Sequence, residues 1–395
     1  MKILLLTPRL PYPPYRGDKL KIYNLIKQLS PRHEITLFTF VTAGDRAEDI
    51  EPLRKLCKEV KVFKLPVWKS ILNCAGNLFS EIPFQVAYYS SGGMSNAFKA
   101  ELESRRYDIA HVHFIRGAQY ALEHSPAIPA VLDLTDAGSL YLERFLNKSK
   151  NVFQRIFLRE ELRRLRLYER NLERFDSCLV CSTIDRDALL RRAPKATIEL
   201  LYNGVDLEYF SPDDAVQCEP DRIILTGNMS YFPNLDGALY FIEEIFPIIR
   251  KSRPGAKVYI VGQNPPTKLR RMSGHNVIVT GFVPDIKEHY LKSTVAVSPI
   301  RFGAGTLNKV LEPMALGVAV VATSVSVMGL AVVPGKDVLV ADTSEEFAAE
   351  VIRLLNDSNL RTKVSQSAKN IVRSTYDWKT IALKLENVYA ELLHK

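Results

Sequence analysis

The chain has 395 residues, and at roughly 150 residues per domain this length predicts two or three domains, of which two large ones suffice. Hydrophobic residues make up 47% and charged residues 25%, which excludes a disordered, collagen-like or disulfide-scaffold protein. The 53 Lys and Arg against 44 Asp and Glu leave a net charge of +9. This balance favours acidic partners such as phosphates, nucleotides or anionic lipids.

The start of the chain and its five scattered cysteines predict a reduced, cytoplasmic protein. The apolar run Ile3–Leu6 stops at Pro8, so it does not resemble a secretory signal. Cys178 and Cys181 have a spacing found in zinc and redox sites, but no second Cys/His pair follows them. We therefore expect both cysteines to be structural.

Short apolar strand candidates alternate with amphipathic stretches along the whole chain. In the first half they are Ile3–Thr7, Ile35–Val41, Ile109–Phe114, Ala130–Leu134 and Ser177–Cys181. After residue 205 they are Arg222–Thr226, Lys257–Val261, Val277–Thr280, Val295–Ser298, Val318–Ala322 and Val338–Val340. This alternation predicts βαβ units and parallel sheets in two α/β domains. We place the domains at residues 1–200 and 201–375, and expect a helix over 376–395 to pack back on the first domain.

An uncharged run from Pro313 to Gly335 is long enough to raise the alternative of a membrane span. Glycine, serine and threonine interrupt the run, and Val318–Ala322 within it has the composition of a buried parallel strand. We therefore expect no membrane span here.

The segment from Ser298 to Gly317 predicts a strand, a glycine loop and a helix that Gly317 ends. Free backbone N–H groups at the start of such a helix suit a phosphate. Lys309 and Glu312 stand three residues apart and share one helix face. Lys309 is a candidate to neutralise a pyrophosphate, with Arg301 as a second cation, and Glu312 to accept hydrogen bonds from ribose hydroxyls.

Lys309, Glu312 and the glycine loop also fit interpretations other than a phosphate site. Lys309 and Glu312 are also compatible with a surface ion pair beside a loop that merely needs glycine. The run 303–308 partly matches a dinucleotide-binding fingerprint, but the acidic ribose ligand expected about 20 residues later is missing, which weakens an NAD-dependent dehydrogenase. Near the start of the chain, Gly17 precedes the helical run Lys19–Leu29 and offers a second set of backbone donors, unless the proline-rich loop is only a rigid connection.

Motifs in a fixed order along nearly the whole chain resemble the retaining GT-B glycosyltransferases of the large bacterial family, group 1, that uses nucleotide sugars. They lie at residues 1–17, 107–113, 202–206, 227–234, 280–285 and 301–317. More narrowly, Gly227-Asn-Met, Pro233-Asn, Arg301–Met314 and Arg159–Phe175 resemble sugar transferases of exosortase (PEP-CTERM) exopolysaccharide systems. The resemblance implies two Rossmann-like doubly wound domains that face a central cleft.

The resemblance also implies roles for residues of the second domain. Glu312 matches the second glutamate of the family's paired motif, which holds the donor ribose, whereas Ala304 stands at the first. We therefore expect sugar contacts from the backbone of Gly303, Ala304, Gly305, Thr306 and Leu307. Asn228 and Pro233 stand where many relatives have phosphate-binding cations, so Arg301 and Lys309 are the expected substitutes. Asn228 remains a donor-binding candidate, and Phe282 and Val283 match the nucleobase loop.

In the first domain, Asp136 occupies a strand end where many relatives have a histidine. It is a candidate to orient the sugar or the acceptor hydroxyl, with a helix cap as the alternative. Of His111 and His113, on one strand, we expect only one to face the cleft, and we favour a packing role for each. The predicted catalytic residues are thus Asp136, Arg301 and Lys309.

The predicted reaction transfers a hexose, with retention, from a nucleotide-diphosphate sugar to a glycan or lipid-linked acceptor in polysaccharide biosynthesis. The resemblance implies that the donor phosphate takes the acceptor proton, and it implies no metal and no cofactor besides the sugar-nucleotide substrate. The alternative is a GT-B-like binding protein without transfer activity, because Ala304 and Asn228 depart from the family pattern.

A basic helix is predicted over residues 153–175, which contain seven arginines and four glutamates. Leu158, Leu162, Leu165, Leu172 and Phe175 recur at helical spacing, so the segment is amphipathic. One interpretation is peripheral binding to an anionic membrane at the inner face of the plasma membrane. The alternative is a solvated helix packed on the first domain, with a Glu160–Arg164 pair. No nucleic-acid reading motif is present in the sequence, so nucleic acid is not an expected partner.

Overall fold

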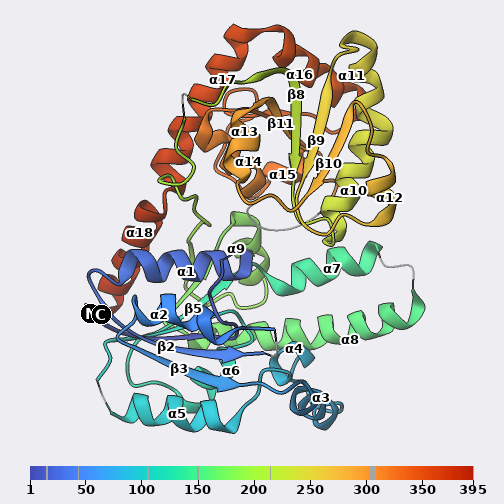
Figure 1. Cartoon of the computed structure of the whole chain (residues 1–395). Coiled ribbons are helices and arrows are strands. Elements are labelled where there is room, and N and C mark those ends of the chain that lie inside the picture. Colours follow the sequence, from blue (N-terminus) through green and yellow to red (C-terminus); the bar gives the residue numbers. More distant parts are fainter. Residues whose placement is uncertain are drawn as a thin grey trace. The chain divides into compact units, whose positions relative to one another are not determined.

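The computed structural model describes residues 1–14, 17–42, 44–104, 106–148, 151–213, 215–302 and 308–394. The chain forms two compact units (Figure 1). Unit 1 comprises Met1–Tyr202 and Ile381–Lys395, and unit 2 comprises Asn203–Thr380. Each unit is built on its own parallel sheet.

The sheet of unit 1 has seven strands in the order β3-β2-β1-β4-β5-β6-β7, all paired in parallel. Its strands are β1 (Lys2–Thr7), β2 (Glu34–Val41), β3 (Glu59–Lys64), β4 (Ile109–His113), β5 (Ala130–Thr135), β6 (Ser177–Val180) and β7 (Ile198–Leu200). Its helices are α1 (Gly17–Leu29), α2 (Glu51–Arg54), α3 (Val67–Gly76), α4 (Phe84–Ala87), α5 (Gly92–Glu103), α6 (Ala118–His124), α7 (Gly138–Lys148), α8 (Val152–Tyr168), α9 (Thr183–Leu190) and most of α18 (Trp378–Leu393). The strand order reverses between β1 and β4, which makes this point a topological switch.

The sheet of unit 2 has six strands in the order β10-β9-β8-β11-β12-β13, also parallel. Its strands are β8 (Glu219–Thr226), β9 (Lys257–Val261), β10 (Val277–Gly281), β11 (Ser293–Ser298), β12 (Ala319–Ala322) and β13 (Leu339–Val340). Its helices are α10 (Phe232–Tyr240), α11 (Phe246–Ser252), α12 (Thr267–Arg271), α13 (Ile286–Leu291), α14 (Asn308–Leu316), α15 (Ser324–Val327), α16 (Ser344–Asn356) and α17 (Ser358–Ile371). Here the order reverses between β8 and β11, so both units have the doubly wound α/β topology that the sequence predicts.

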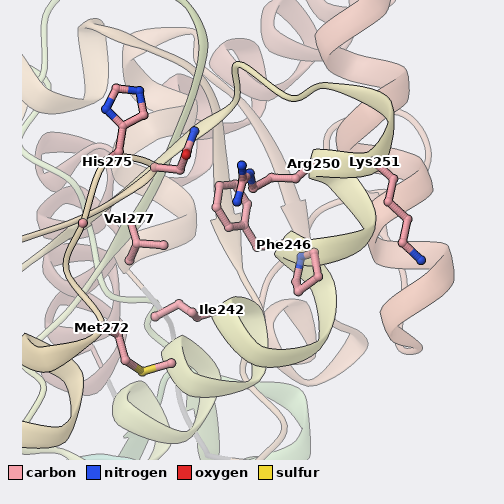
Figure 2. Close-up of a pocket in the computed structure, with 10 residues that line it drawn as sticks. Ile242, Phe246, Arg250, Lys251, Met272, His275 and Val277 are labelled. Atoms are coloured by element: carbon pink, nitrogen blue, oxygen red, sulfur yellow. The ribbon is translucent and has the colours of Figure 1, made fainter.

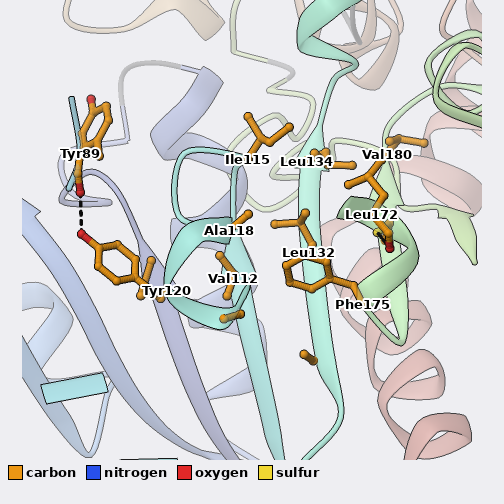
Figure 3. Packing of buried hydrophobic residues seen from close by; sticks show 14 of the residues in the cluster. Tyr89, Val112, Ile115, Ala118, Tyr120, Leu132, Leu134, Leu172, Phe175 and Val180 are labelled. Carbon is orange, nitrogen blue, oxygen red and sulfur yellow. Dashed lines mark hydrogen bonds between the residues drawn. The ribbon is translucent and has the colours of Figure 1, made fainter. Parts of the chain in front are cut away.

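The core of unit 1 packs apolar side chains of central strands against the helices beside them. Val112 of β4 and Leu132 of β5 lie next to Ala118 of α6 (Figure 3). In the same core the Tyr120 hydroxyl donates to the backbone oxygen of Tyr89 at 2.5 Å, so this buried polar group has a partner.

The predicted strand and helix of the 298–317 segment are confirmed. β11 ends at Ser298 and α14 begins at Asn308. Gly317 follows α14 with φ of +79°, a left-handed conformation that favours glycine at a helix end. The uncharged run that begins at Pro313 contains the last part of α14, β12 and α15. In the described part of the chain, no helix is long and apolar enough to cross a membrane.

The basic segment divides into α8, which ends at Tyr168, and a 3-10 turn over Glu169–Arg174. The apolar side chains that suggested a membrane face are buried, and they are Leu158, Leu162, Leu165, Leu172 and Phe175. That face packs inside unit 1 and is not presented to a membrane. The alternative of a packed helix with a Glu160–Arg164 pair is confirmed, because Arg164 Nε donates to Glu160 Oε1 at 2.7 Å.

Candidate functional site

Three loops at the carboxyl ends of β8, β9 and β10 are held together by backbone contacts. Gly227 N donates to Val261 O at 3.1 Å, and Gly262 N donates to Gly281 O at 3.0 Å. A Cβ atom on Gly262 would lie 1.9 Å from Gly227 O, so only glycine fits this approach. Asn228 follows Gly227 in the first of these loops and is therefore fixed at this edge of the sheet.

Lys309 is hydrogen-bonded to α10, the helix that follows the loop containing Asn228. Its Nζ donates to Asn234 Oδ1, and Asn234 Nδ2 donates to Asn228 O at 2.9 Å. The carboxamide of Asn234 thus links the first turn of α14 to the end of β8. Burial lowers the pKa of Lys309 to about 8, and the negative charge of Glu312 opposes this shift.

Glu312 is hydrogen-bonded to a different helix, α13. Its Oε2 accepts a hydrogen bond of 3.0 Å from the hydroxyl of Tyr290 on α13, which lies 2.7 Å from Thr226 Oγ1 at the end of β8. Burial raises the pKa of Glu312 to about 7, opposed by the Tyr290 hydrogen bond and by Lys309. Because Lys309 and Glu312 bond to separate elements, the alternative of a simple surface ion pair is wrong.

Arg301 lies beyond the end of β11 and forms a two-point ion pair with α10. Its Nε and Nη2 donate to the carboxylate oxygens of Asp236 at 2.9 and 2.7 Å. The guanidinium carbon lies 4.6 Å from the ring centroid of Tyr240, a cation–π contact. The Arg301 side chain is 45% exposed. A fixed and partly accessible guanidinium therefore lies beyond the carboxyl end of β11.

The remaining predicted donor residues of unit 2 are described only in part. Phe282 and Val283 follow β10 after Gly281, whose φ is +78°, and the ring of Phe282 is exposed. Gly303, Ala304, Gly305, Thr306 and Leu307 lie outside the described residues. The described site is therefore made of Asn228, Lys309, Glu312, Arg301 and the loop after β10.

In unit 1, Gly17 is the first residue of α1, and Asp136 follows β5. Cys181 Sγ lies 3.2 Å from Asp136 Oδ1 as a donor, while Asp185 accepts the N–H of Ala137 at 3.0 Å. Burial and the charge of Asp185 raise the pKa of Asp136 to about 6. Asp136 is thus a carboxyl group whose protonation changes near neutral pH.

Both histidines of β4 lie beside the same buried carboxylate, so our expectation that alternation along the strand would turn only one of them toward the cleft is wrong. Residues two apart in a strand point to the same face, and ligand atoms of His111, His113 and Asp133 lie within 4.8 Å of one another. Lys21 Nζ donates to Asp133 Oδ1 at 2.8 Å and to Leu201 O at 3.2 Å. The ammonium already compensates this carboxylate, so we interpret the group as a buried network that holds α1 on the sheet.

A pocket of about 520 Å³ lies in unit 2, near the start of β10 (Figure 2). Its lining comes from the π-helix Phe241–Ile245, α11, the segment before β10 and the first residue of β10: Ile242, Phe246, Pro247, Arg250, Lys251, Met272, Gly274, His275, Asn276 and Val277. Val277 begins β10, whereas the candidate residues follow strand ends. This pocket is therefore separate from the candidate site.

The sequence did not reveal four partners of the candidate residues: Asn234, Asp236, Thr226 and Tyr290. Asn234 and Asp236 lie in the first turns of the helix after β8, and Thr226 ends that strand. Polar side chains at a strand end and in the next helical turn are a signal that could have drawn attention to these three. Tyr290 lies near the end of α13, where no spacing pattern indicates it.

Two family descriptions match the chain in succession. Residues 22–209 match "Glycosyltransferase Family 4", and residues 220–357 match "Glycosyl transferases group 1". An uncharacterized 44.6 kDa protein in the cps region of Klebsiella pneumoniae is 20% identical over 399 residues, which cover 96% of this chain and 97% of that protein. A GDP-mannose-dependent phosphatidylinositol monomannoside mannosyltransferase of Mycobacterium tuberculosis is 29% identical over 214 residues, 49% of this chain and 55% of that protein.

Solved structures with the same fold extend over the whole chain. Sucrose-phosphate synthase from Thermosynechococcus elongatus has a TM-score of 0.70 at 18% identity, covering 100% of this chain and 99% of that one. Anabaena HepE in complex with UDP-glucose has a TM-score of 0.68 at 16% identity, covering 99% and 100%. At such identities the likeness establishes the fold, two Rossmann-like domains, and not the substrate.

Proposed function

We propose that the chain is a glycosyltransferase that transfers a hexose from a nucleotide-diphosphate sugar to a glycan or lipid-linked acceptor, with retention and without a bound metal. Two glycosyltransferase family descriptions that match residues 22–209 and 220–357 in succession, and the fold shared with solved structures, support this proposal. The observation that carries the proposal is that separate hydrogen bonds fix Lys309 and Glu312 on one face of α14. Lys309 is held by Asn234, and Glu312 is held by Tyr290. A fixed cation and a fixed carboxylate on one helix face suit a diphosphate and a ribose.

Lys309 is proposed to stabilise the leaving nucleoside diphosphate. Negative charge grows on the phosphate oxygen as the bond to the sugar C1 breaks, and a positioned ammonium stabilises that charge. Asn234 accepts from the ammonium, so it orients Lys309 without neutralising it. Lys309 thereby substitutes for the cations that relatives carry at the positions of Asn228 and Pro233.

Arg301 is proposed as the second phosphate-binding cation. Its ion pair with Asp236 uses two of the guanidinium N–H groups, and an arginine side chain has five. The other donors and the partial exposure of the side chain leave room for a phosphate oxygen. We further propose that Phe282 and Val283 contact the nucleobase, while Asn228 and the 303–307 backbone contact the donor.

Two residues of unit 1 complete the proposal, Asp136 on the acceptor side and Gly17 on the donor side. Asp136 is proposed to orient the attacking hydroxyl, and the first N–H groups of α1, at Gly17, to face a phosphate. The acceptor oxygen bonds to the sugar C1 on the face that the phosphate leaves, and the hydroxyl proton passes to a phosphate oxygen of the departing nucleotide. This step balances without a protein base.

Calorimetric titration with a panel of nucleotide sugars tests the site. Lys309→Ala and Glu312→Ala should each weaken donor binding by about tenfold or more, because each removes a charge-assisted contact. Lys336→Ala, which removes an exposed lysine of unit 2, is the matched control and should bind as the unchanged protein does. Donor affinity that is unchanged in both site variants would contradict the placement of the site.

A transfer assay with membrane lipid extracts and glycan acceptors tests the activity itself. The expected result is release of the nucleoside diphosphate together with a glycosylated product of retained configuration. Donor binding without transfer or hydrolysis would overturn the enzyme and favour a sugar-nucleotide-binding protein. Undiminished transfer after exhaustive chelation of metals is the outcome expected for a metal-independent reaction.

A further inference from the structure

Exposed large apolar side chains gather on one part of unit 1. Of the twenty such side chains among the described residues, eleven lie in two short segments, 67–82 and 152–157. They are Val67, Trp68, Ile71, Leu72, Leu78, Phe79, Ile82, Val152, Phe153, Ile156 and Phe157. A concentration of this kind marks an interaction site. We call this surface the apolar platform.

Helix α3 is amphipathic, but its apolar face points away from the protein. At about 100° per residue, Val67, Trp68, Ile71 and Leu72 form one contiguous stripe, and all four are exposed. The opposite face is polar and packs inward, where Asn73 Nδ2 donates to Ser90 O at 2.9 Å. A surface helix that only covers a core has the reverse orientation.

The turn after α3 is held by one arginine of α8. Arg164 Nη1 donates to Asn77 O at 2.7 Å and to Ile82 O at 3.2 Å, and its Nη2 donates to Leu78 O at 2.5 Å. Its guanidinium carbon lies 4.2 Å from the ring centroid of Phe84. This buried arginine satisfies the backbone carbonyls of the turn, so the turn keeps a fixed shape while Phe79, at its tip, is 98% exposed.

The first turns of α8 continue the platform. The ring of Phe157 stacks on Phe84 at 5.5 Å between centroids, and Phe153 one turn earlier is 84% exposed. Helices α3, α4 and α8 lie together at one side of unit 1 (Figure 1). The two apolar stripes are therefore parts of one surface.

The charges around the platform identify its partner. Over the described residues 64–82 and 151–163 the sequence has five Lys and Arg against three Glu. Glu161 is turned inward and accepts the N–H groups of Phe84 and Gln85 at 2.7 and 3.1 Å, while Glu160 is bonded to Arg163 and Arg164. Exposed apolar side chains within a basic border suit the interface of an anionic bilayer.

We propose that the apolar platform inserts into the surface of an anionic lipid bilayer, with Trp68, Phe79 and Phe153 as the leading side chains. The membrane-facing part is thus α3, the 77–82 turn and the first turns of α8. It is not the apolar face of residues 158–175, which is buried. The inference does not rest on the transfer reaction, because it concerns a surface made of other residues.

Sedimentation with vesicles of phosphatidylcholine and phosphatidylglycerol in equal parts tests the proposal. The double variant Phe79→Asp with Phe153→Asp places two charges on the platform, and we expect its vesicle binding to fall by about tenfold or more. The matched control is Leu383→Asp with Val333→Asp, which adds the same charges at exposed apolar positions elsewhere. The control should bind as the unchanged protein does, and vesicles of phosphatidylcholine alone should bind less.

Tryptophan fluorescence gives a second readout that reports insertion directly. The chain has two tryptophans; Trp68 is 65% exposed, whereas Trp378 is 2% exposed. The emission should move to shorter wavelength when anionic vesicles are added, and Trp68→Phe should abolish this change.

Three results would overturn the proposal: no vesicle binding by the unchanged protein, equal binding by the platform variant and its control, or a dimer in sedimentation velocity that the platform variant dissociates. The last would assign the surface to a second copy of the chain. Donor titration on the same variants should give unchanged affinity, so a failure here is distinguishable from a failure of the proposed transfer function.

Discussion

At the scale of single residues, Lys309 and Glu312 carry opposite charges together only over a narrow range of pH. Burial raises the pKa of Glu312 to about 7 and lowers that of Lys309 to about 8. The Glu312 carboxylate, which we propose to accept ribose hydroxyls, forms as the pH rises through the first value. The Lys309 ammonium, which we propose to attract a diphosphate, is lost as the pH rises through the second. In the proposed function the two groups therefore set both pH limits of donor binding.

Donor affinity should accordingly pass through a maximum between these two pKa values, and calorimetric titrations on both sides of that range will measure it. Lys309→Arg should extend binding toward alkaline pH, because a guanidinium stays protonated there. Glu312→Gln should flatten the acidic limb, since an amide does not titrate. An affinity independent of pH in the unchanged protein would contradict the assignment of these two groups.

Asp136 gives a stability prediction with a definite sign. Its pKa is raised from 3.8 to about 6, so the folded state holds the proton more tightly than the unfolded state does. The stability that this provides at low pH is lost as the pH rises through the folded value. Asp136→Asn should therefore raise the free energy of unfolding at pH 7 by about 1–2 kcal/mol, with little change at acidic pH, while it lowers transfer.

Thermal unfolding at neutral and acidic pH measures this effect. Asp187→Asn is the matched control, because Asp187 lies on the exposed side of α9, and its stability should differ little from that of the unchanged protein at either pH. If Asp136→Asn destabilised the protein at pH 7, the carboxylate would be favourable where it lies.

At the scale of elements, every strand that the sequence predicts is present, because each of them, including the edge strands β10 and β13, is a short apolar run. Strands β3 and β7 were not predicted. Both lie at edges of the sheet of unit 1, and neither has a fully buried residue. Edge strands carry polar or charged residues, so their pattern resembles that of a loop.

The candidate site was predictable only where its residues are close in the sequence. Lys309 and Glu312 follow from helical spacing, and Gly317 from the end of the same helix. The bonds of Lys309 to Asn234, 75 residues away, and of Arg301 to Asp236, 65 residues away, depend on how helices pack around the sheet. The error on His111 and His113 came from applying strand alternation to residues two apart, which share a face.

The contact between the loops after β8 and β9 gives a prediction for a single methyl group. In Gly262→Ala the new Cβ would meet Gly227 O, at a position where φ is already +153°. We expect unit 2 to lose about 2–4 kcal/mol of stability, and donor binding to weaken because Asn228 moves with Gly227.

Chemical unfolding and donor titration measure the two effects of this change. Gly255→Ala, where nothing lies within 4 Å of the new Cβ, is the matched control and should be close to neutral. Equal stability of the two variants would mean that the backbone contact is not tight.

At the scale of the whole molecule, the chain returns to unit 1 through its last residues. Unit 2 is one continuous segment, whereas unit 1 needs both Met1–Tyr202 and Ile381–Lys395. The returning part of α18 buries Leu385 and Tyr389, and the Tyr389 hydroxyl lies 2.6 Å from Nδ1 of His111 on β4. Glu386 also accepts from Arg32 Nε at 2.8 Å. The C-terminal helix is thus part of the core of unit 1.

Truncation after Thr380 should therefore destabilise unit 1 and leave unit 2 nearly unchanged. The five large buried side chains removed contribute about 5 kcal/mol or more together, and they are Ile381, Leu385, Val388, Tyr389 and Leu392. This is comparable to the whole stability of a typical domain, so we expect the unit 1 transition to disappear from differential scanning calorimetry, or to move far down in temperature. Truncation after Leu393 removes only two terminal residues and should preserve both transitions. If the shorter chain kept its unit 1 transition, the returning helix would be an appendage and not part of that core.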